Sequence, residues 1–276
     1  MKLVTWNTQW CCGMDGVVSP QRIVDGARAM ADFDVLCLQE IAQGYDALQG
    51  TPGDQPAQLA ALLPGYQLFF GAAVDEFRAD GTRQRFGNLI ATRLPVLQVQ
   101  HHALPWPADA GRSSMPRMCT VLTLRDPQLG ALRVMTTHLE YYSAVQRLAQ
   151  ARALCELHAQ ASAMAAAPPA DDEAGSPFQA KTHTPLAILC GDFNLEASEP
   201  EHALIEAAGL RDAWRVLHGP RPQDPTFRLV DRRYGPDPIA CDFVFVSAGL
   251  VSHVQRMWVD GRTRDSDHQP VALQLG

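Results

Sequence analysis

The sequence lacks several features that would place it in a specialised class. None of its apolar runs approaches the roughly 20 residues that a membrane-spanning helix needs. Its first residues lead directly into a strand-like pattern, which predicts no secretory signal. It has no Cys-x-x-Cys pair, and its seven cysteines are an odd number that lie mostly within apolar runs. We therefore expect free, buried thiols, a cytoplasmic location, no zinc centre and no association with a membrane.

Positive charge is also scarce. The 276-residue chain has a net charge of −7, and only two of its 23 basic residues are lysines. Proteins that attract nucleic acid over a long range are usually basic, so the composition disfavours such attraction but leaves room for a local patch that binds a compact phosphate. Arginine suits bidentate phosphate binding. The simpler explanation of the arginine excess is biased codon use, because alanine is abundant as well.

Short apolar runs bounded by Gly, Pro, Asp or Asn predict strands along the whole chain. These runs cover residues 3–6, 35–39, 67–70, 88–92, 118–124, 132–137, 186–190, 243–246 and 271–275. Helices are expected from a Ser19 cap to about residue 30, at 55–63, from a Ser143 cap to about residue 164 with Val145 toward the core, and at 199–217 with a break near Gly209. Many strands with fewer helices predict an α+β layered sandwich.

One segment breaks this pattern. Residues 165–184 are rich in Ala, Pro and acidic residues and show no periodicity. They predict a mobile surface loop and not a domain boundary. Since no internal repeat is evident, we expect residues 1–276 to form a single domain.

Polar residues recur at the ends of the predicted strands, where loops held by a rigid sheet usually carry chemistry. The set comprises Asn7, Glu40, His138, Asp192, Asn194, Asp242, Asp267 and His268. Taken singly, each has an ordinary explanation as a turn former or a solvated loop residue. Six groups at the same kind of position weaken those explanations together.

The chemistry of this set points to phosphate esters. It offers oxygen ligands and two imidazoles but no thiolate, which favours Mg²⁺ or Mn²⁺ over zinc. A divalent ion of this kind polarises a phosphoryl oxygen, and a nearby aspartate can orient or deprotonate water. A histidine can donate to the phosphoryl oxygens as negative charge develops on them.

The order of the motifs Thr-Trp-Asn, Leu-Gln-Glu, Thr-His-Leu, Gly-Asp-Phe-Asn, Asp-Phe-Val-Phe and Ser-Asp-His resembles the endonuclease/exonuclease/phosphatase superfamily, whose fold is DNase I-like. The motifs extend from Asn7 to His268, so the resemblance covers nearly the whole chain. It implies a four-layer α/β/β/α sandwich of two packed mixed β-sheets flanked by helices, with the site at one edge of the sheets.

The resemblance also implies a metal site. Glu40 matches the principal metal ligand of the family, and Asn7 matches the amide beside it. Asp267 matches a carboxylate near the metal. The implied cofactor is Mg²⁺ or Mn²⁺.

Catalytic roles follow from the same resemblance. Asp192 and Asn194 match the pair that positions the attacking water and the scissile phosphate, with Asp192 as the general base. His268 matches the imidazole that binds a phosphoryl oxygen, and Asp242 the carboxylate that orients and charges it. His138 matches a position that contacts the phosphate or the leaving group.

Three residues are candidate substrate contacts. Asn88 lies in a Gly-Asn-Leu-Ile segment that resembles a strand near the family's site, and Arg112 lies among arginines that flank apolar strands, with Arg83, Arg85 and Arg117. Arg228 precedes Asp242 on a loop that often contacts substrate in the family. For every arginine, a solvated surface position is the ordinary alternative.

These observations predict a divalent-metal-dependent phosphoester hydrolase that cleaves phosphodiesters, as a nuclease does, through metal-assisted attack of water. The alternative is a phosphatase or phosphodiesterase that acts on a small or lipid-derived phosphate, such as an inositol phosphate or a sphingomyelin-like substrate. Family frequency favours the first and the acidic net charge the second. A non-catalytic binding module is disfavoured because the polar set is complete. We expect a phosphate-ester substrate, nucleic acid among the candidates, and no obligate protein partner.

Overall fold

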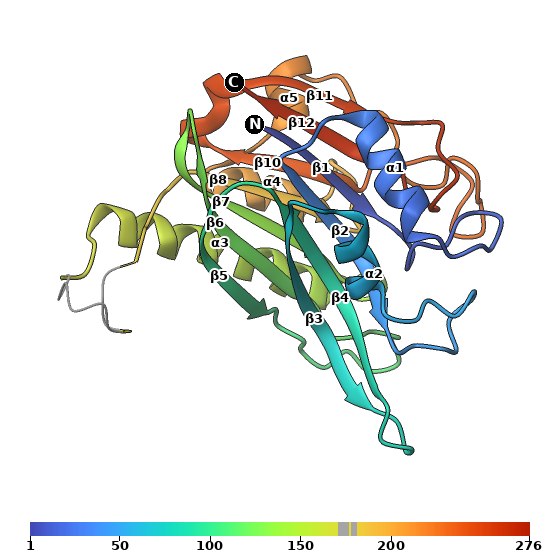
Figure 1. Ribbon diagram of the computed structural model, residues 1–276. Coiled ribbons are helices and arrows are strands. Elements are labelled where there is room, and N and C mark those ends of the chain that lie inside the picture. The colour runs from blue at the N-terminus through green and yellow to red at the C-terminus, as the bar shows by residue number, and fades with distance from the viewer. Residues whose placement is uncertain (171–176, 178–180) are drawn as a thin grey trace.

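The computed structural model describes residues 1–170, 177 and 181–276, and its strands form two six-stranded sheets (Figure 1). The first sheet has the order β11-β12-β1-β2-β4-β3, and the second has the order β5-β6-β7-β8-β10-β9. The strands of the first sheet are β1 (Lys2–Asn7), β2 (Val35–Gln43), β3 (Gln67–Phe77), β4 (Arg83–Thr92), β11 (Val254–Val259) and β12 (Val271–Leu275). The strands of the second are β5 (Val96–Ala103), β6 (Met118–Asp126), β7 (Gly130–His138), β8 (Ala187–Asp192), β9 (Leu210–Asp212) and β10 (Asp242–Ser247). Both sheets are mixed, because β1/β2 and β7/β8 pair in parallel.

Three buried apolar clusters separate four layers. The inner cluster joins the two sheets, for example Leu3 and Ile90 to Val134 and Ile188. A second cluster packs α1 (Pro20–Met30) and α2 (Gln55–Leu62) on the first sheet, and a third packs α3 (Ala144–Ala166) and α4 (Pro200–Ala207) on the second. Two short helices, α5 (Ala213–His218) and the 3₁₀ helix η1 (Ala248–His253), complete the chain. The expected α+β four-layer sandwich is confirmed.

The helix starts follow the sequence signals. Ser19 Oγ accepts from the Arg22 backbone N–H at 3.3 Å, and Ser143 Oγ accepts from Gln146 N–H at 3.2 Å. These caps satisfy N–H groups that a helix leaves open in its first turn. The expectation that Val145 faces the core is wrong, since its side chain is exposed. The buried stripe of α3 contains Arg147, Ala151, Leu154 and His158, and Val145 lies off this stripe.

Other expectations need correction or stay open. The region 199–217 is not one broken helix. A short strand, β9, lies between α4 and α5 in the chain and pairs with β10. Residues 165 and 166 of the predicted loop 165–184 belong to α3, and the loop positions 171–176 and 178–180 lie outside the described residues, so the predicted mobility stays a prediction. All seven cysteines are free, and six of them are buried as expected, while Cys155 is half-buried. Across the described part of the chain, no helix has both the length and the apolarity to cross a bilayer.

Candidate active site

The two sheets present their polar residues at one shared edge. In the second sheet, strand register places Asp192 opposite His138 on one side and opposite Asp242 on the other. Asn7 ends β1 in the first sheet, where it pairs with Gln39 of β2. Residues that are far apart in sequence therefore meet at the edge of the sandwich, as the sequence predicted.

Glu40 lies at an irregularity of β2 and not beyond its end. The strand continues to Gln43, and the pairing of β2 with β4 shifts between Leu38 and Ile41. Glu40 adopts a positive φ of 60°, which a non-glycine residue rarely takes. A β-bulge re-aims a side chain in this way, and such strained residues concentrate at functional sites.

Asn7 connects the acidic residues of the two sheets. Its Nδ2 donates to Glu40 Oε1 at 3.1 Å and to Asp192 Oδ2 at 2.9 Å. Its Oδ1 accepts from the Gln9 backbone N–H at 3.1 Å. Since both amide hydrogens bond carboxylates, Asn7 holds the Glu40 and Asp192 carboxylates close together.

Three carboxylates line one cavity of about 240 Å³, from Glu40, Asp192 and Asp267. Burial and the neighbouring Asp267 raise the pKa of Glu40 to about 7. Burial and the nearby Asp242 raise the pKa of Asp192 to about 6, and burial raises the pKa of Asp267. Carboxylates gathered in this way suit a hard divalent cation, which would relieve their mutual repulsion. The donor set therefore fits the Mg²⁺ or Mn²⁺ site that the sequence predicts.

His268 forms a buried pair with Asp242. Its Nδ1 lies 2.9 Å from Asp242 Oδ2, and its Nε2 lies 3.7 Å from Asp192 Oδ2. The ring of Phe227 stacks on the imidazole at a centroid distance of 4.3 Å. Burial alone would lower the pKa of His268, but the carboxylates of Asp242 and Asp192 raise it well above its usual value. His268 is therefore a cation whose Nε2–H is a donor beside Asp192.

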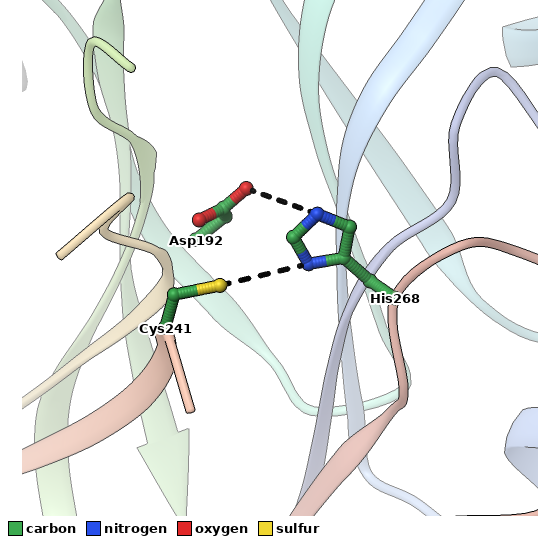
Figure 2. A group of neighbouring side chains, drawn as sticks. All are labelled: Asp192, Cys241 and His268. Atoms are coloured by element: carbon green, nitrogen blue, oxygen red, sulfur yellow. Dashed lines mark hydrogen bonds and ion pairs between the residues drawn. The ribbon is translucent and has the colours of Figure 1, made fainter. Parts of the chain in front are cut away.

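A cysteine accompanies this pair, as Figure 2 shows with Asp192 and His268. Cys241 Sγ lies 4.0 Å from His268 Nδ1 and 3.6 Å from Asp242 Oδ2. Burial and the two nearby carboxylates raise the pKa of the Cys241 thiol well above its usual value. Asp192, Cys241 and His268 together offer one carboxylate, one thiol and one imidazole, a mixed donor set that differs from the oxygen ligands that Mg²⁺ and Mn²⁺ prefer. The acidic residues are the better metal ligands.

His138 and Asn194 form a neutral pair at the opposite side of Asp192. Asn194 Nδ2 donates to His138 Nε2 at 3.0 Å and to the Leu139 carbonyl at 2.9 Å. The Asn194 backbone N–H donates to Asp192 Oδ1 at 2.9 Å, and the residue has a positive φ of 51°. Burial, Arg117 and His268 lower the pKa of His138 well below its usual value. His138 therefore accepts at Nε2 and carries its proton on Nδ1, 4.0 Å from Glu40 Oε1.

The structure does not place the three candidate substrate contacts, Asn88, Arg112 and Arg228, in the lining of the cavity. Asn88 is buried and donates to the Met118 carbonyl at 3.2 Å, so it supports the chain beside the cavity. Arg112 is exposed, and Arg228 donates from Nη1 to the Tyr234 carbonyl at 3.1 Å. Neither arginine is among the residues that line the cavity.

Other residues take those places. Arg117, which the sequence offers only as one of several arginines beside apolar strands, lines the cavity. Aromatic side chains that no motif indicated also line it: Trp10, Phe86, Tyr141, Tyr142, Phe227 and Tyr234. They come from four stretches of the chain, around residues 10, 86, 141–142 and 227–234, and no sequence pattern links these stretches. Only the positive charge of Arg117 was a usable signal.

Comparisons with known proteins agree with the fold. A model of the Endonuclease/Exonuclease/phosphatase family matches residues 4–268. A protein of this class from Beutenbergia cavernae is similar in structure, with a TM-score of 0.74 and 24% identity over 100% of this chain and 72% of the other. A mannosyl-6-phosphatase from Bacteroides thetaiotaomicron has a TM-score of 0.67 and 18% identity, over 100% and 99% of the two chains. D. rerio TDP2 with a single-strand DNA product has a TM-score of 0.66 and 16% identity, over 100% and 98%. No curated protein matches this chain.

Proposed function

The chain belongs to the Endonuclease/Exonuclease/phosphatase family, and from this premise we propose that it hydrolyses phosphate esters with a divalent metal ion. The meeting of Glu40, Asp192 and His268 around one cavity carries the proposal. Acids that suit a hard cation lie there beside a cationic imidazole. This combination is suited to negative charge that develops on a phosphoryl group.

Asp192 is the proposed general base. Its Oδ1 accepts from Asn194 and its Oδ2 from Asn7, so two donors fix the carboxylate. It takes a proton from water as the water oxygen bonds to phosphorus. The ester P–O bond breaks, and the leaving oxygen keeps the electron pair and takes up a proton from solvent, while Asp192 later releases its own.

His268 and the acidic residues stabilise the charge that this step creates. The Nε2–H of His268 donates to a phosphoryl oxygen, and Asp242 holds the ring through Nδ1. Glu40 and Asp267 would hold Mg²⁺ or Mn²⁺, which supplies Lewis-acid stabilisation of phosphoryl charge when bound. Asn7, the third ligand that the sequence suggested, turns its Nδ2 toward Glu40 and its Oδ1 toward the Gln9 N–H, so in this arrangement it orients the Glu40 carboxylate. Phe227 covers one face of the imidazole and restricts its orientation.

The substrate is either a phosphodiester or a small phosphate ester. The sequence-based expectation is a phosphodiester, and among the similar structures one holds a single-strand DNA product while another is a mannosyl-6-phosphatase. The cavity of about 240 Å³ favours the alternative of a small phosphate ester, since pockets for drug-sized ligands begin at about 300 Å³.

The first test is hydrolysis of p-nitrophenyl phosphate and bis-p-nitrophenyl phosphate with Mn²⁺ or Mg²⁺. We expect a chelator to abolish the reaction, and Glu40→Gln or Asp192→Asn to slow it by at least about 10²–10³. Glu156→Gln, on the exposed face of α3, is the matched control and should change nothing. Activity that survives both the chelator and the two site substitutions would contradict the proposed function.

A further inference from the structure

Arg117 is a buried arginine whose charge the fold uses only in part. The residue immediately precedes β6, its side chain is 7% exposed, and it lines the cavity with Glu40 and His138. Its Nε donates to Glu140 Oε2 at 3.2 Å. Within the described residues, Nη1 and Nη2 donate no hydrogen bond, and Nη1 is buried as well. Buried charged N–H groups are rarely left without an acceptor, so these nitrogens point to a ligand.

Glu140 holds the guanidinium in one orientation. This carboxylate is fully buried, and its other oxygen, Oε1, accepts from the Tyr142 backbone N–H at 2.9 Å. The Glu140 backbone N–H donates to Gln150 Oε1 at 2.9 Å. Because Glu140 is fixed and occupies the Nε side, the planar guanidinium keeps Nη2, the terminal nitrogen that retains accessible surface, free for another acceptor. A charged N–H group of a fixed arginine suits an anionic oxygen.

Arg117 and His268 line the same cavity as His138, and the charges of both act on it. Burial lowers the pKa of His138 most, and the charges of Arg117 and His268 both lower it further. The cavity therefore has three separate places that suit a phosphoryl oxygen. They are Nε2 of His268, the carboxylates through a divalent ion, and Nη2 of Arg117.

We propose that Arg117 binds the third non-bridging oxygen of a phosphate monoester, and that the enzyme therefore prefers monoesters to diesters. A monoester has three non-bridging oxygens, and a diester has two. A diester would leave the guanidinium facing an esterified oxygen with little charge, at the cost of burying a cation. A monoester also carries close to two negative charges at neutral pH. This inference rests on the proposed function and names its substrate class.

The test compares kcat/KM for p-nitrophenyl phosphate and bis-p-nitrophenyl phosphate in one Mn²⁺ buffer. Arg117→Met keeps most of the side-chain length and removes the charge. We expect it to lower kcat/KM for the monoester about 10²-fold or more and for the diester less than about tenfold. Arg117→Lys, which keeps the charge but loses the fork, should fall between the wild type and Arg117→Met. Calorimetry should also show that Arg117→Met binds inorganic phosphate at least tenfold more weakly.

Matched variants separate this role from a structural one. Arg112→Gln changes an exposed arginine outside the cavity and should alter neither substrate. Because Arg117→Met leaves Glu140 without its partner, Arg117→Met with Glu140→Met removes both charges and should keep the same loss of monoester preference. Equal losses on both substrates, or unchanged phosphate binding, would overturn the inference. A wild-type protein that hydrolyses neither ester would instead contradict the proposed function.

Discussion

A buried histidine lies near a buried arginine at two places along β7, in its first half at Arg133 and at its last residue, His138, but only the second place has the features of an active site. At the first place, Arg133 Nη2 lies 2.9 Å from His158 Nδ1, and Arg133 Nε donates to the Thr184 carbonyl at 3.3 Å. At the second place, His138 lies in the cavity that Arg117 also lines. Burial lowers the histidine pKa at both places, and the nearby arginine lowers it further. Buried His and Arg side chains alone therefore do not identify the site.

The difference lies in the acids and in the free donors. Arg133 borders a second cavity, of about 190 Å³, whose lining within the described residues includes no Asp or Glu. The donors of Arg133 are used by neutral acceptors in the protein. The second place instead gathers three carboxylates and leaves the terminal nitrogens of Arg117 unbonded in the described residues. Concentrated like charge together with unused donors is what marks a place for a metal ion and an anion.

The largest contrast should come from the two histidines. His268→Ala removes the donor to the phosphoryl group, and we expect kcat to fall about 10²–10³-fold. His158→Ala, beside Arg133, should leave kcat within about twofold, although it costs stability. Steady-state kinetics on p-nitrophenyl phosphate measures both. Mn²⁺ affinity should be unchanged in His268→Ala, and weaker Mn²⁺ binding would mean that His268 is a metal ligand and that its assigned role is wrong.

A smaller effect is expected at the residue that orients His268. Asp242→Asn keeps a hydrogen-bond acceptor for Nδ1 but removes the charge that keeps the imidazole cationic. Loss of an outer partner of this kind typically costs about 10–100-fold, which we expect in kcat. The chain contains a matched control, because Asp212 and His202 form another buried pair at 3.0 Å on the second sheet and α4. Asp212→Asn should retain full activity, and equal losses in the two variants would indicate a general effect on folding.

Central strands and edge strands differ in how well the sequence predicts them. Central strands such as β8 are apolar runs bounded by turn residues, so their pattern is plain. The strands β5 and β11 were not predicted, and each lies at the edge of its sheet. Their sequences, VLQVQHHA and VQRMWV, mix polar and apolar residues, and all but one of their positions are half-buried or exposed. An edge strand needs only one covered face, so its apolar signal is weak.

Within the site, the sequence identified residue types better than backbone geometry. The strand-end pattern identified Asn7, Asp192 and His268 as candidates, the family resemblance implied a site at one edge of the sheets, and the contacts show that the three residues meet there. The β2 irregularity at Glu40 could not be predicted, because a bulge depends on how β2 pairs with β4 and not on local composition. The sequence also could not show which of Arg112 and Arg117 lines the site, because tertiary packing alone buries Arg117 and leaves Arg112 exposed.

The smallest expected effect concerns the histidine beside Arg133 and appears in stability, not in turnover. Burial, with a smaller contribution from Arg133, lowers the pKa of His158 to about 4 in the folded protein. The unfolded chain has a histidine pKa of about 6.5, so it binds a proton first as the pH falls. The folded state should therefore lose on the order of 2 kcal/mol relative to the unfolded state between pH 7.5 and pH 5. His158→Gln can still accept from Arg133 but does not titrate, so its unfolding free energy should fall by about 2 kcal/mol less over that range. Urea unfolding of both proteins at the two pH values measures this difference, and identical pH dependence would show that His158 does not have the lowered pKa.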